Sequence, residues 1–376
     1  MRVALIVPGF SESADDWAIP ALLNLARVLA ESHELHVFSQ RYPGEGLYEF
    51  DGVIHHALGG GQRYGLDSVR IWLQSSQAIV RQHRQRPFDI LHAYWADEAG
   101  FAAVVAGGWI GCPVIVSLGG GELSRLPHLD YGAQRFLSRR LTTRYALTRA
   151  AVVTAGSSYQ LNLGRAYQLP ESKLRYAPLG VDIIRFQPPG GACEEFADGT
   201  PTLTQAASLI PVKNQALLLH VLQRVKKQLP QIKLNLAGSG ACRPRLEQLA
   251  NRLEVGHNIR WHGQVSYSSM APFYRQSHLY LQTSHHESQG MAVLEAMACG
   301  VPVIGTPVGI VRDVACRPMT TTVEGLAAQA VEILSDQTTY RELRRRARQT
   351  VEAEFSVGLA AKRFSEIYSE AIIFDE

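Results

Sequence analysis

Two carboxylates, Glu287 and Glu295, flank a glycine that opens a helical stretch. An apolar run ends near Thr283, a loop then carries Glu287, and helical periodicity begins around Gly290. The first amides of such a helix favour phosphate oxygens. Carboxylates at two depths along the same segment are good acceptors for sugar hydroxyls. The segment therefore predicts a site for a ligand that carries both phosphate and hydroxyl groups.

Short apolar runs alternate with longer helical patterns, which is typical of βαβ units and a parallel sheet. The expected strands are Arg2–Val7, Glu34–Phe38, Phe88–Ala93, Pro113–Leu118, Ala151–Ala155 and Lys173–Ala177, then Leu203–Ala207, Lys233–Ala237, Asn258–His262, Leu279–Thr283 and Val301–Gly305. The expected helices are Ile19–Glu31, Asp67–His83, Gly132–Thr148, Asn214–Gln228, Arg243–Leu253 and Gly290–Cys299, followed by a helical stretch over 338–373 that breaks near 355–358.

Two prolines and two glycines at 188–191 interrupt this pattern and mark a domain boundary. We therefore expect an α/β protein with two doubly wound domains, residues 1–186 and 187–354, and a helix over 355–376 that packs back on the first domain. Ligands of such sheets bind beyond the carboxyl ends of the strands. We expect the chemistry in a cleft between the two domains.

The composition is that of an ordinary globular protein, with 376 residues, 46% of them hydrophobic and 19% charged. A net charge of +3 is too mild to indicate nucleic-acid binding. Five cysteines without a Cys-x-x-Cys spacing suggest neither a disulfide framework nor a zinc site. Neither a secretory signal nor a long apolar span is apparent, so we expect a cytoplasmic protein.

The phrase from Glu287 to Glu295 resembles the Glu-x7-Glu signature of family 4 of the retaining glycosyltransferases, which includes sucrose and trehalose synthases. The resemblance implies the GT-B fold, with two Rossmann-like domains that face a cleft. It also implies that Glu287 contacts the donor sugar and Glu295 the ribose, while the amides of Gly290, Met291 and Ala292 hold the diphosphate.

Further stretches match this family in the same order, and one of them departs from it. Gly238 and Gly240 resemble the loop beside the nucleotide base. Lys213 occupies the position of the family's diphosphate lysine, but Ser208 stands where an arginine is usual. Arg243 is a candidate replacement for that arginine, and a solvated surface position is the alternative. Arginine and lysine contacts are not interchangeable, so the substitution bears on donor binding.

In the first domain, the resemblance places the acceptor beside two loops. Gly9 and Phe10 follow the first strand, as the family's acceptor-facing loop does. Gly119, Gly120 and Glu122 occupy the phrase in which the family often carries a histidine, and Gly119 replaces it. The glycines favour either close approach to a ligand or a tight turn.

His92 ends another strand, and we expect either a substrate contact that substitutes for the missing histidine or a structural role. The adjacent His285 and His286 lack the other ligands of a metal site. The family's amides and cations take the place of a metal, so we expect neither a metal nor a cofactor, and the nucleotide-sugar is a substrate.

The resemblance predicts retaining transfer from a nucleotide-sugar to a hydroxyl of a carbohydrate, lipid-linked or small-molecule acceptor. Two alternatives stay open, a non-catalytic binding subunit, suggested by Ser208 and Gly119, and a nucleotide-sugar epimerase. The helix Gly132–Thr148 combines five arginines, up to Arg149, with Phe136 and several leucines. It fits either peripheral contact with acidic lipids at the inner face of a membrane or packing on a core.

Overall fold

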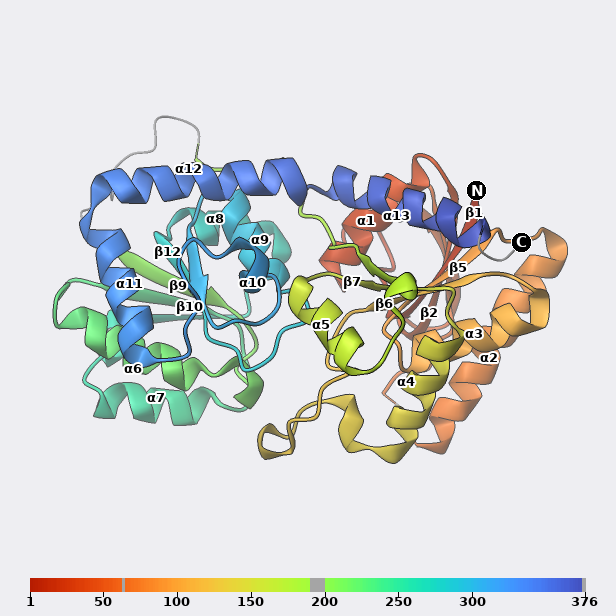
Figure 1. Ribbon diagram of the computed structural model, residues 1–376, viewed down its shortest axis with the longest axis horizontal. Coiled ribbons are helices and arrows are strands. Elements are labelled where there is room, and N and C mark those ends of the chain that lie inside the picture. Colours follow the sequence, from red (N-terminus) through yellow and green to blue (C-terminus); the bar gives the residue numbers. More distant parts are fainter. Residues whose placement is uncertain (63–64, 190–199, 374–376) are drawn as a thin grey trace. The chain divides into compact units, whose positions relative to one another are not determined.

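The computed structural model describes residues 1–62, 65–189 and 200–373, so Gly190 and Gly191 of the predicted boundary lie outside the described residues. The chain forms two compact units. Unit 1 comprises Met1–Gly180 and Val357–Glu376, and unit 2 comprises Val181–Ser356. Each unit is a largely parallel sheet with helices on both faces (Figure 1). The predicted α/β class with two Rossmann-like domains is confirmed.

The sheet of unit 1 has eight strands in the order β3-β4-β2-β1-β5-β6-β7-β8. Their bounds are Arg2–Gly9 for β1, Glu34–Tyr42 for β2, Gly46–Phe50 for β3, Val53–Ala57 for β4, Ile90–Tyr94 for β5, Val114–Leu118 for β6, Val152–Ala155 for β7 and Leu174–Tyr176 for β8. Every residue of β5 and β6 is buried. This is expected of parallel strands that helices cover on both faces.

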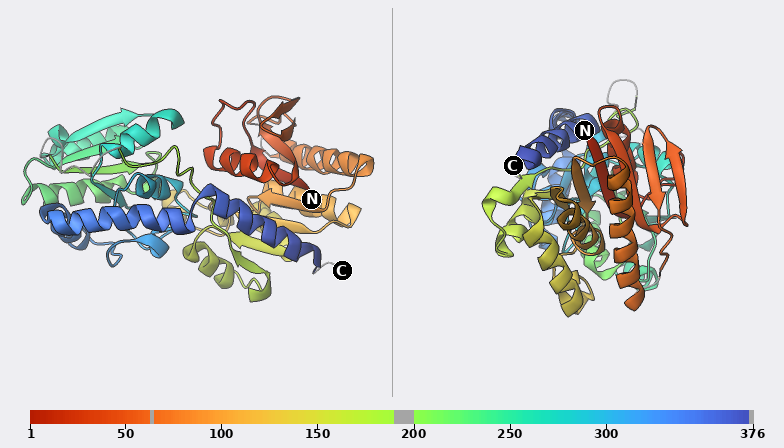
Figure 2. Two further views of the ribbon diagram at one scale, coloured as in Figure 1. Left: turned by 90° about the horizontal axis from the view of Figure 1, so that it is seen from above. Right: turned by 90° about the vertical axis from the view of Figure 1, so that its right-hand side faces the viewer.

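Helices cover each face of this sheet with a separate apolar core. One core packs the sheet against α1 (Pro20–Ala30) and α13 (Val357–Ile373), and Phe364 and Tyr368 of α13 belong to it. The other core packs the opposite face against α2 (Leu66–Gln85), α3 (Glu98–Ile110), α4 (Leu137–Arg149) and α5 (Ser158–Ala166). Figure 2 shows these two helical layers of unit 1 from two further sides.

Four elements of unit 1 were not predicted, namely β3, β4, α3 and α5. Strands β3 and β4 form an antiparallel hairpin around Asp51 and Gly52, which both have positive φ. Asp-Gly is a strong hairpin signal, so this turn could have been found. Helix α3 is apolar on nearly all sides and packs between α2 and α4. It therefore has no polar face that would reveal a helical period.

Unit 2 has a five-stranded parallel sheet in the order β11-β10-β9-β12-β13. The strands are β9 (Thr202–Ala206), β10 (Lys233–Ala237), β11 (Ile259–Gly263), β12 (Leu279–Gln282) and β13 (Val303–Gly305). The helices are α6 (Gln215–Lys226), α7 (Arg243–Arg252), α8 (Tyr267–Arg275), α9 (Met291–Ala298), α10 (Val311–Val314), α11 (Val323–Ser335) and α12 (Gln337–Glu354). The predicted helical break near 355–358 is confirmed, because α12 ends at Glu354 and α13 begins at Val357.

The first core of unit 2 packs the sheet against α6, α7 and α11, and the second packs it against α8, α9 and the later turns of α12. Helices α8, α10 and α11 were not predicted, and α8 contains an internal proline, Pro272. Within the described ranges, no helix combines the length and the apolar composition needed to cross a bilayer.

Candidate functional site

Lys213 and Glu287 form an ion pair in unit 2. The Lys213 ammonium lies 2.6 Å from Oε1 of Glu287 and also contacts Oε2. Lys213 ends a 3₁₀ turn, and Asn214 follows in the left-handed conformation, where its side chain caps α6. Glu287 lies in the loop between β12 and α9. Both side chains are mostly but not fully buried, so the pair remains accessible to a ligand.

Backbone and hydroxyl hydrogen bonds hold the two loops of this pair together. The His285 amide donates to the Val212 carbonyl at 2.8 Å. The Thr283 hydroxyl donates to the Lys213 carbonyl at 3.2 Å. The loop geometry that brings Lys213 to Glu287 is therefore fixed by the fold and does not depend on the ion pair alone.

The loop that carries Glu287 also depends on two glycines. Gly290 has φ +92 and is the N-cap of α9. Gly309 has φ +56, and a Cβ there would lie 2.6 Å from the Gln289 carbonyl oxygen and 2.7 Å from Cβ of Glu287. At position 309, only glycine fits both the backbone conformation and the available space. The first amides of α9, which belong to the segment Gly290 to Ala292, have no acceptor within their own helix and are suited to an anion.

Glu295 lies one turn further along α9 and has an ordered partner. The Tyr274 hydroxyl, from α8, donates to Oε2 of Glu295 at 3.0 Å. Burial raises the pKa of Glu295 to about 7, and the hydrogen bond from Tyr274 lowers it. After burial, the charges of Glu287 and Glu295 both contribute to raising the pKa of the Tyr280 hydroxyl. Both carboxylates therefore lie near enough to the Tyr280 hydroxyl of β12 to act on it.

The loop from Gly238 to Gly240 packs against the segment that contains Ser208. A Cβ at Gly238 would lie 2.0 Å from the Ala207 carbonyl oxygen, and its φ is +127. The Leu209 amide donates to the Ser239 carbonyl at 2.9 Å. Ser208 itself is exposed. The structure thus places the predicted base-side loop and the position of the missing arginine side by side.

Arg243 already has partners on α7 and on the neighbouring strand β11. Its Nε donates to Oε1 of Glu247 at 2.9 Å, and its guanidinium lies 5.5 Å from the centre of the Trp261 ring. Its substitution for the missing arginine stays a prediction, and it would require Arg243 to share or leave Glu247.

In unit 1, Glu122 folds back on the glycine loop that precedes it. Its carboxylate accepts from the Gly119 amide at 2.9 Å and the Gly120 amide at 2.6 Å, and the side chain is buried. Burial and the nearby Asp97 raise its pKa to about 7, and the backbone hydrogen bonds lower it. The Trp95 ring lies 2.9 Å from the position of a Cβ at Gly119. Gly119 and Gly120 thus leave space for the ring of Trp95, which a side chain at either position would displace.

His92 is enclosed in the core of unit 1. Its Nδ1 lies 2.8 Å from the Tyr368 hydroxyl and its Nε2 lies 2.7 Å from the Ser117 hydroxyl. Burial lowers the pKa of His92 to about 3. Both ring nitrogens are engaged, so a substrate contact would require one of these bonds to break.

Gly9 ends β1, and Phe10 follows it without exposed surface. The Phe10 ring lies edge-on to His55 and stacks on Phe50. These contacts fix the start of the loop at 11–17, which the sequence predicts to face the acceptor. Phe10 therefore shapes this loop through its buried ring contacts and has no exposed surface of its own.

In unit 2 the structure joins Lys213 to Glu287 and places the Gly238–Gly240 loop against the segment of Ser208. In unit 1 it anchors the predicted residues in hydrogen bonds and ring contacts. Tyr274 was missed by the sequence analysis, since α8 itself was not predicted. Within the part of the chain that the structure describes, no three His, Cys, Asp or Glu side chains cluster closely enough to hold a metal ion.

Two family models match the chain. "Glycosyltransferase Family 4" matches residues 21–185, and "Glycosyl transferases group 1" matches residues 193–350. The N-acetyl-alpha-D-glucosaminyl L-malate synthase of Bacillus anthracis is 26% identical over 371 residues, which cover 94% of this chain and 93% of the relative. A D-inositol 3-phosphate glycosyltransferase of Streptomyces bingchenggensis is 32% identical over 144 residues, 35% of this chain and 32% of the relative.

Two solved structures resemble the fold over almost its full length. The sucrose-phosphate synthase of Thermosynechococcus elongatus has a TM-score of 0.79 at 19% identity and covers 99% of both chains. HepE of Anabaena, in complex with UDP, has a TM-score of 0.73 at 15% identity and covers 98% of this chain and 100% of its own. At these identities the likeness concerns the fold alone.

Proposed function

Because the chain belongs to family 4 of the glycosyltransferases and has the GT-B fold, we propose that it transfers a sugar, with retention and without a metal, from a nucleoside diphosphate sugar to an acceptor hydroxyl. The observation that carries this proposal is the Lys213–Glu287 pair, held beside the N-terminus of α9. A cation, a carboxylate and a helix N-terminus provide what a charged diphosphate and a hydroxylated sugar require.

The donor is bound by unit 2 in this proposal. The amides of Gly290, Met291 and Ala292 hold the diphosphate together with Lys213. Glu287 accepts hydrogen bonds from the donor sugar, and Glu295, oriented by Tyr274, accepts them from the ribose. Gly238 and Gly240 leave room for the base. Before the donor binds, Lys213 neutralises Glu287, and the diphosphate then becomes a second anion for the same ammonium.

The chemistry requires no side-chain nucleophile. The bond between the anomeric carbon and the diphosphate oxygen breaks, and the acceptor oxygen forms its bond to the same carbon on the same face. The acceptor proton passes to the departing diphosphate. Lys213 and the α9 amides stabilise the negative charge that develops on this leaving group, which is an electrostatic contribution to the rate. Orientation of both substrates supplies the remainder.

The acceptor is bound by unit 1 in this proposal, beside the loop of Gly119, Gly120 and Glu122 and the loop that follows Gly9 and Phe10. Relatives differ in their acceptors. One is named for malate, others for inositol phosphate, and the Streptococcus pneumoniae relative is an alpha-monoglucosyldiacylglycerol synthase. Acidic small molecules and lipid-linked hydroxyls are therefore the acceptor classes to test first. A lipid-linked acceptor would bring the protein to the inner face of a membrane.

Calorimetric titration with UDP-, GDP- and ADP-sugars tests the donor site. We expect one nucleotide class to bind, and Lys213→Ala and Glu295→Ala to lose most of this affinity. Lys227→Ala is the matched control, because Lys227 is an exposed lysine near the end of α6. Binding that survives both site variants, or no binding of any nucleotide-sugar by the wild type, would contradict the proposal.

The stereochemistry and the metal independence need separate measurements. NMR of the product formed with excess chelator should show the anomeric configuration of the donor and an undiminished rate. An inverted product or a rate abolished by chelator would contradict the corresponding part of the proposal.

A further inference from the structure

The outer face of α4 is apolar and basic at the same time. Leu137 and Leu141 are 69% and 61% exposed, and they lie four residues apart on one side of the helix, in line with Tyr145. Phe136, just before the helix, is also exposed. Large apolar side chains in a row on a helix surface are unusual for a face that only meets water.

The charges on this face are all positive. Helix α4 contains no acidic residue, and Arg140, Arg144 and Arg149 are exposed. Among the described residues, none of these three arginines makes a salt bridge. Arg139, by contrast, pairs with Asp97 at 3.2 Å, so its charge is already partnered within unit 1. The outward arginines are therefore available to an anionic partner.

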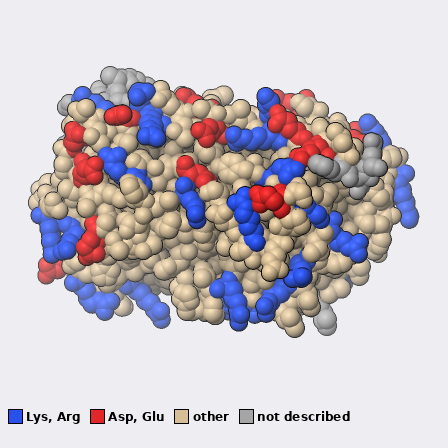
Figure 3. All heavy atoms as spheres, viewed as in Figure 1, with Lys and Arg blue, Asp and Glu red and all other residues tan. Residues whose placement is uncertain are grey.

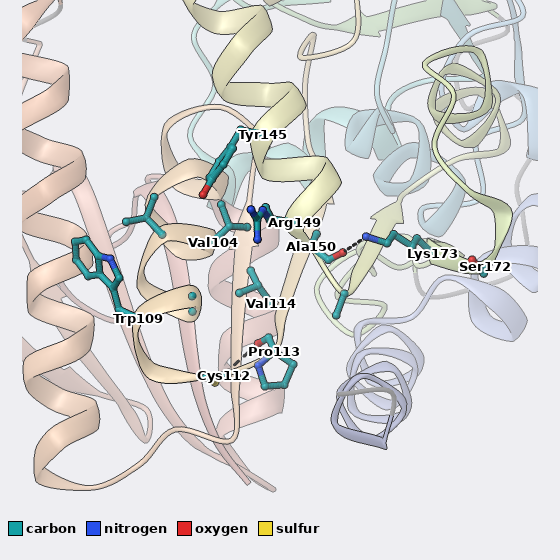
Figure 4. Close-up of a pocket in the computed structure, with 15 residues that line it drawn as sticks. Val104, Trp109, Cys112, Pro113, Val114, Tyr145, Arg149, Ala150, Ser172 and Lys173 are labelled. Carbon is teal, nitrogen blue, oxygen red and sulfur yellow. Dashed lines mark hydrogen bonds between the residues drawn. The ribbon is translucent and has the colours of Figure 1, made fainter. Parts of the chain in front are cut away.

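The same character continues onto α3 and α2. Trp109 of α3 is 57% exposed and borders two hollows. The first, of ≈ 750 Å³, is also lined by Tyr145 and Arg149, and Figure 4 shows these side chains around it. The second is lined by residues of α2 that include Arg81 and Arg84. An exposed indole thus borders one hollow that Arg149 lines and another that Arg81 and Arg84 line.

Figure 3 shows several Lys and Arg side chains and no Asp or Glu along the lower border of unit 1, over α4. Tryptophan and tyrosine beside arginine are the residues that favour the boundary between lipid headgroups and acyl chains. A helix that lies in this boundary inserts its apolar side chains while its basic side chains meet acidic headgroups. The α4 face has both components.

The start of α4 is also joined to the predicted acceptor loop. The Gln134 side-chain amide donates to the Glu122 carbonyl at 2.6 Å, and the Ala133 amide donates to the Gly121 carbonyl at 3.0 Å. Both donors lie a few residues before Leu137. A surface that contacts Leu137 is therefore close to the loop of Gly119, Gly120 and Glu122.

We propose that the face formed by Phe136, Leu137, Arg140, Leu141, Arg144 and Tyr145, together with Trp109, docks on an anionic phospholipid bilayer, and that the acceptor is lipid-linked. The acceptor part of this inference rests on the proposed function, whereas the docking part does not. A second copy of this chain is disfavoured as the occupant, since a symmetric contact would bring these arginines against one another.

Vesicle flotation tests the docking. The full chain is mixed with vesicles of phosphatidylcholine alone or with added phosphatidylglycerol. We expect it to float only with the anionic vesicles, and to be released by salt. Arg140→Glu/Arg144→Glu should lower the vesicle partition coefficient by about thirtyfold, and Leu137→Ser/Leu141→Ser by about tenfold.

The matched control is Arg345→Glu/Arg346→Glu on α12 of unit 2, which makes the same charge change on exposed arginines. It should float like the wild type. All variants should keep the wild-type melting temperature and nucleotide-sugar affinity, because the substituted side chains are exposed. Retained affinity separates a failure of docking from a failure of the donor site.

Three results would overturn the proposal. The first is absence of flotation by the wild type, and the second is equal flotation by the α4 variants and the control. The third is a dimer, detected by light scattering, that the α4 variants dissociate. If docking holds but vesicle-embedded hydroxyl lipids accept no sugar while a soluble acceptor does, the lipid-linked acceptor is rejected and the proposed transferase activity stands.

Discussion

The two units share an architecture, but the carboxylates of Glu122 in unit 1 and Glu287 in unit 2 have different kinds of hydrogen-bond partner. In unit 1, Glu122 is 2% exposed and binds two amides of its own loop. In unit 2, Glu287 has a lysine as its partner and remains partly exposed. A carboxylate satisfied by backbone amides stabilises a loop, whereas one held by a side-chain ammonium can share that ammonium with a substrate. The partner, more than the residue type, distinguishes the two roles.

The largest expected effect comes from making the same substitution in both units. Glu287→Gln should lower the transfer rate by about 10²–10³, because it removes the charge that positions Lys213 and accepts sugar hydroxyls. Glu122→Gln should leave nucleotide-sugar affinity unchanged and loosen the Gly119–Gly120 loop, since the two amides donate to different carboxylate oxygens and the NH2 group that replaces one of them cannot accept. Steady-state kinetics and calorimetry measure the two outcomes. Equal loss of donor affinity in both variants would remove the distinction.

Acid should destabilise unit 1 before unit 2. Burial lowers the pKa of His55 and His56 in unit 1 to about 4. Since their folded pKa lies below the unfolded one, the unfolded chain binds these protons first, and unit 1 loses stability as the pH falls from about 6.5 to about 4. Protonation of each of these histidines should lower the free energy of unfolding by about 3 kcal/mol across this pH range. Burial raises the pKa of Glu122 and Asp97, which acts in the opposite direction, whereas burial lowers the pKa of His92 to about 3, which adds to the effect of the two histidines.

Hydrogen exchange at neutral and acidic pH, corrected for intrinsic rates, measures the stability of each unit separately. It therefore tests whether unit 1 loses protection at a higher pH than unit 2. His55→Gln, which keeps a donor for Ser39 but does not titrate, should reduce the acid sensitivity of unit 1. His220→Gln, at an exposed position on α6, is the control. Loss of protection in both units at the same pH would mean that the histidines do not set the order.

A smaller effect is expected at Tyr274. Tyr274→Phe removes the hydrogen bond to Glu295 and should weaken nucleotide-sugar binding about tenfold. Because this bond lowers the pKa of Glu295, its loss should also move the acid limb of binding to higher pH. A merely structural tyrosine would change the melting temperature without moving this limb. Tyr267→Phe, at the start of the same helix, is the control.

The smallest effect is expected at Ser208. Ser208→Arg adds the cation that the family usually carries and should raise donor affinity about threefold, since the position is exposed. Ser208→Lys should give less, because lysine lacks the planar fork. Gln228→Arg adds the same charge beyond α6 and should have no effect. A lower donor affinity in Ser208→Arg would show that another group already occupies the space of the family's usual arginine side chain.

Much of unit 2 could be predicted from local signals, and less of unit 1. Gly290 before α9, and the break between α12 and α13, follow from residue types at fixed spacings. The contacts of His92 do not, because Tyr368 is 276 residues away in the sequence. The Tyr274–Glu295 bond joins two helices, and no pattern within either one indicates it. Features that depend on the residues of one segment could therefore be predicted from the sequence. Contacts between segments far apart in the sequence could not.

Unit 1 is interrupted in the sequence by all of unit 2, and α13 supplies Phe364 and Tyr368 to its core. During synthesis, the ribosome therefore completes Val181–Ser356 before it makes the helix that closes the first core. The part of the sheet and of α1 that α13 covers keeps its apolar side chains exposed until α13 has been made. The order of translation thus leaves the core of unit 1 incomplete until all of unit 2 has been made.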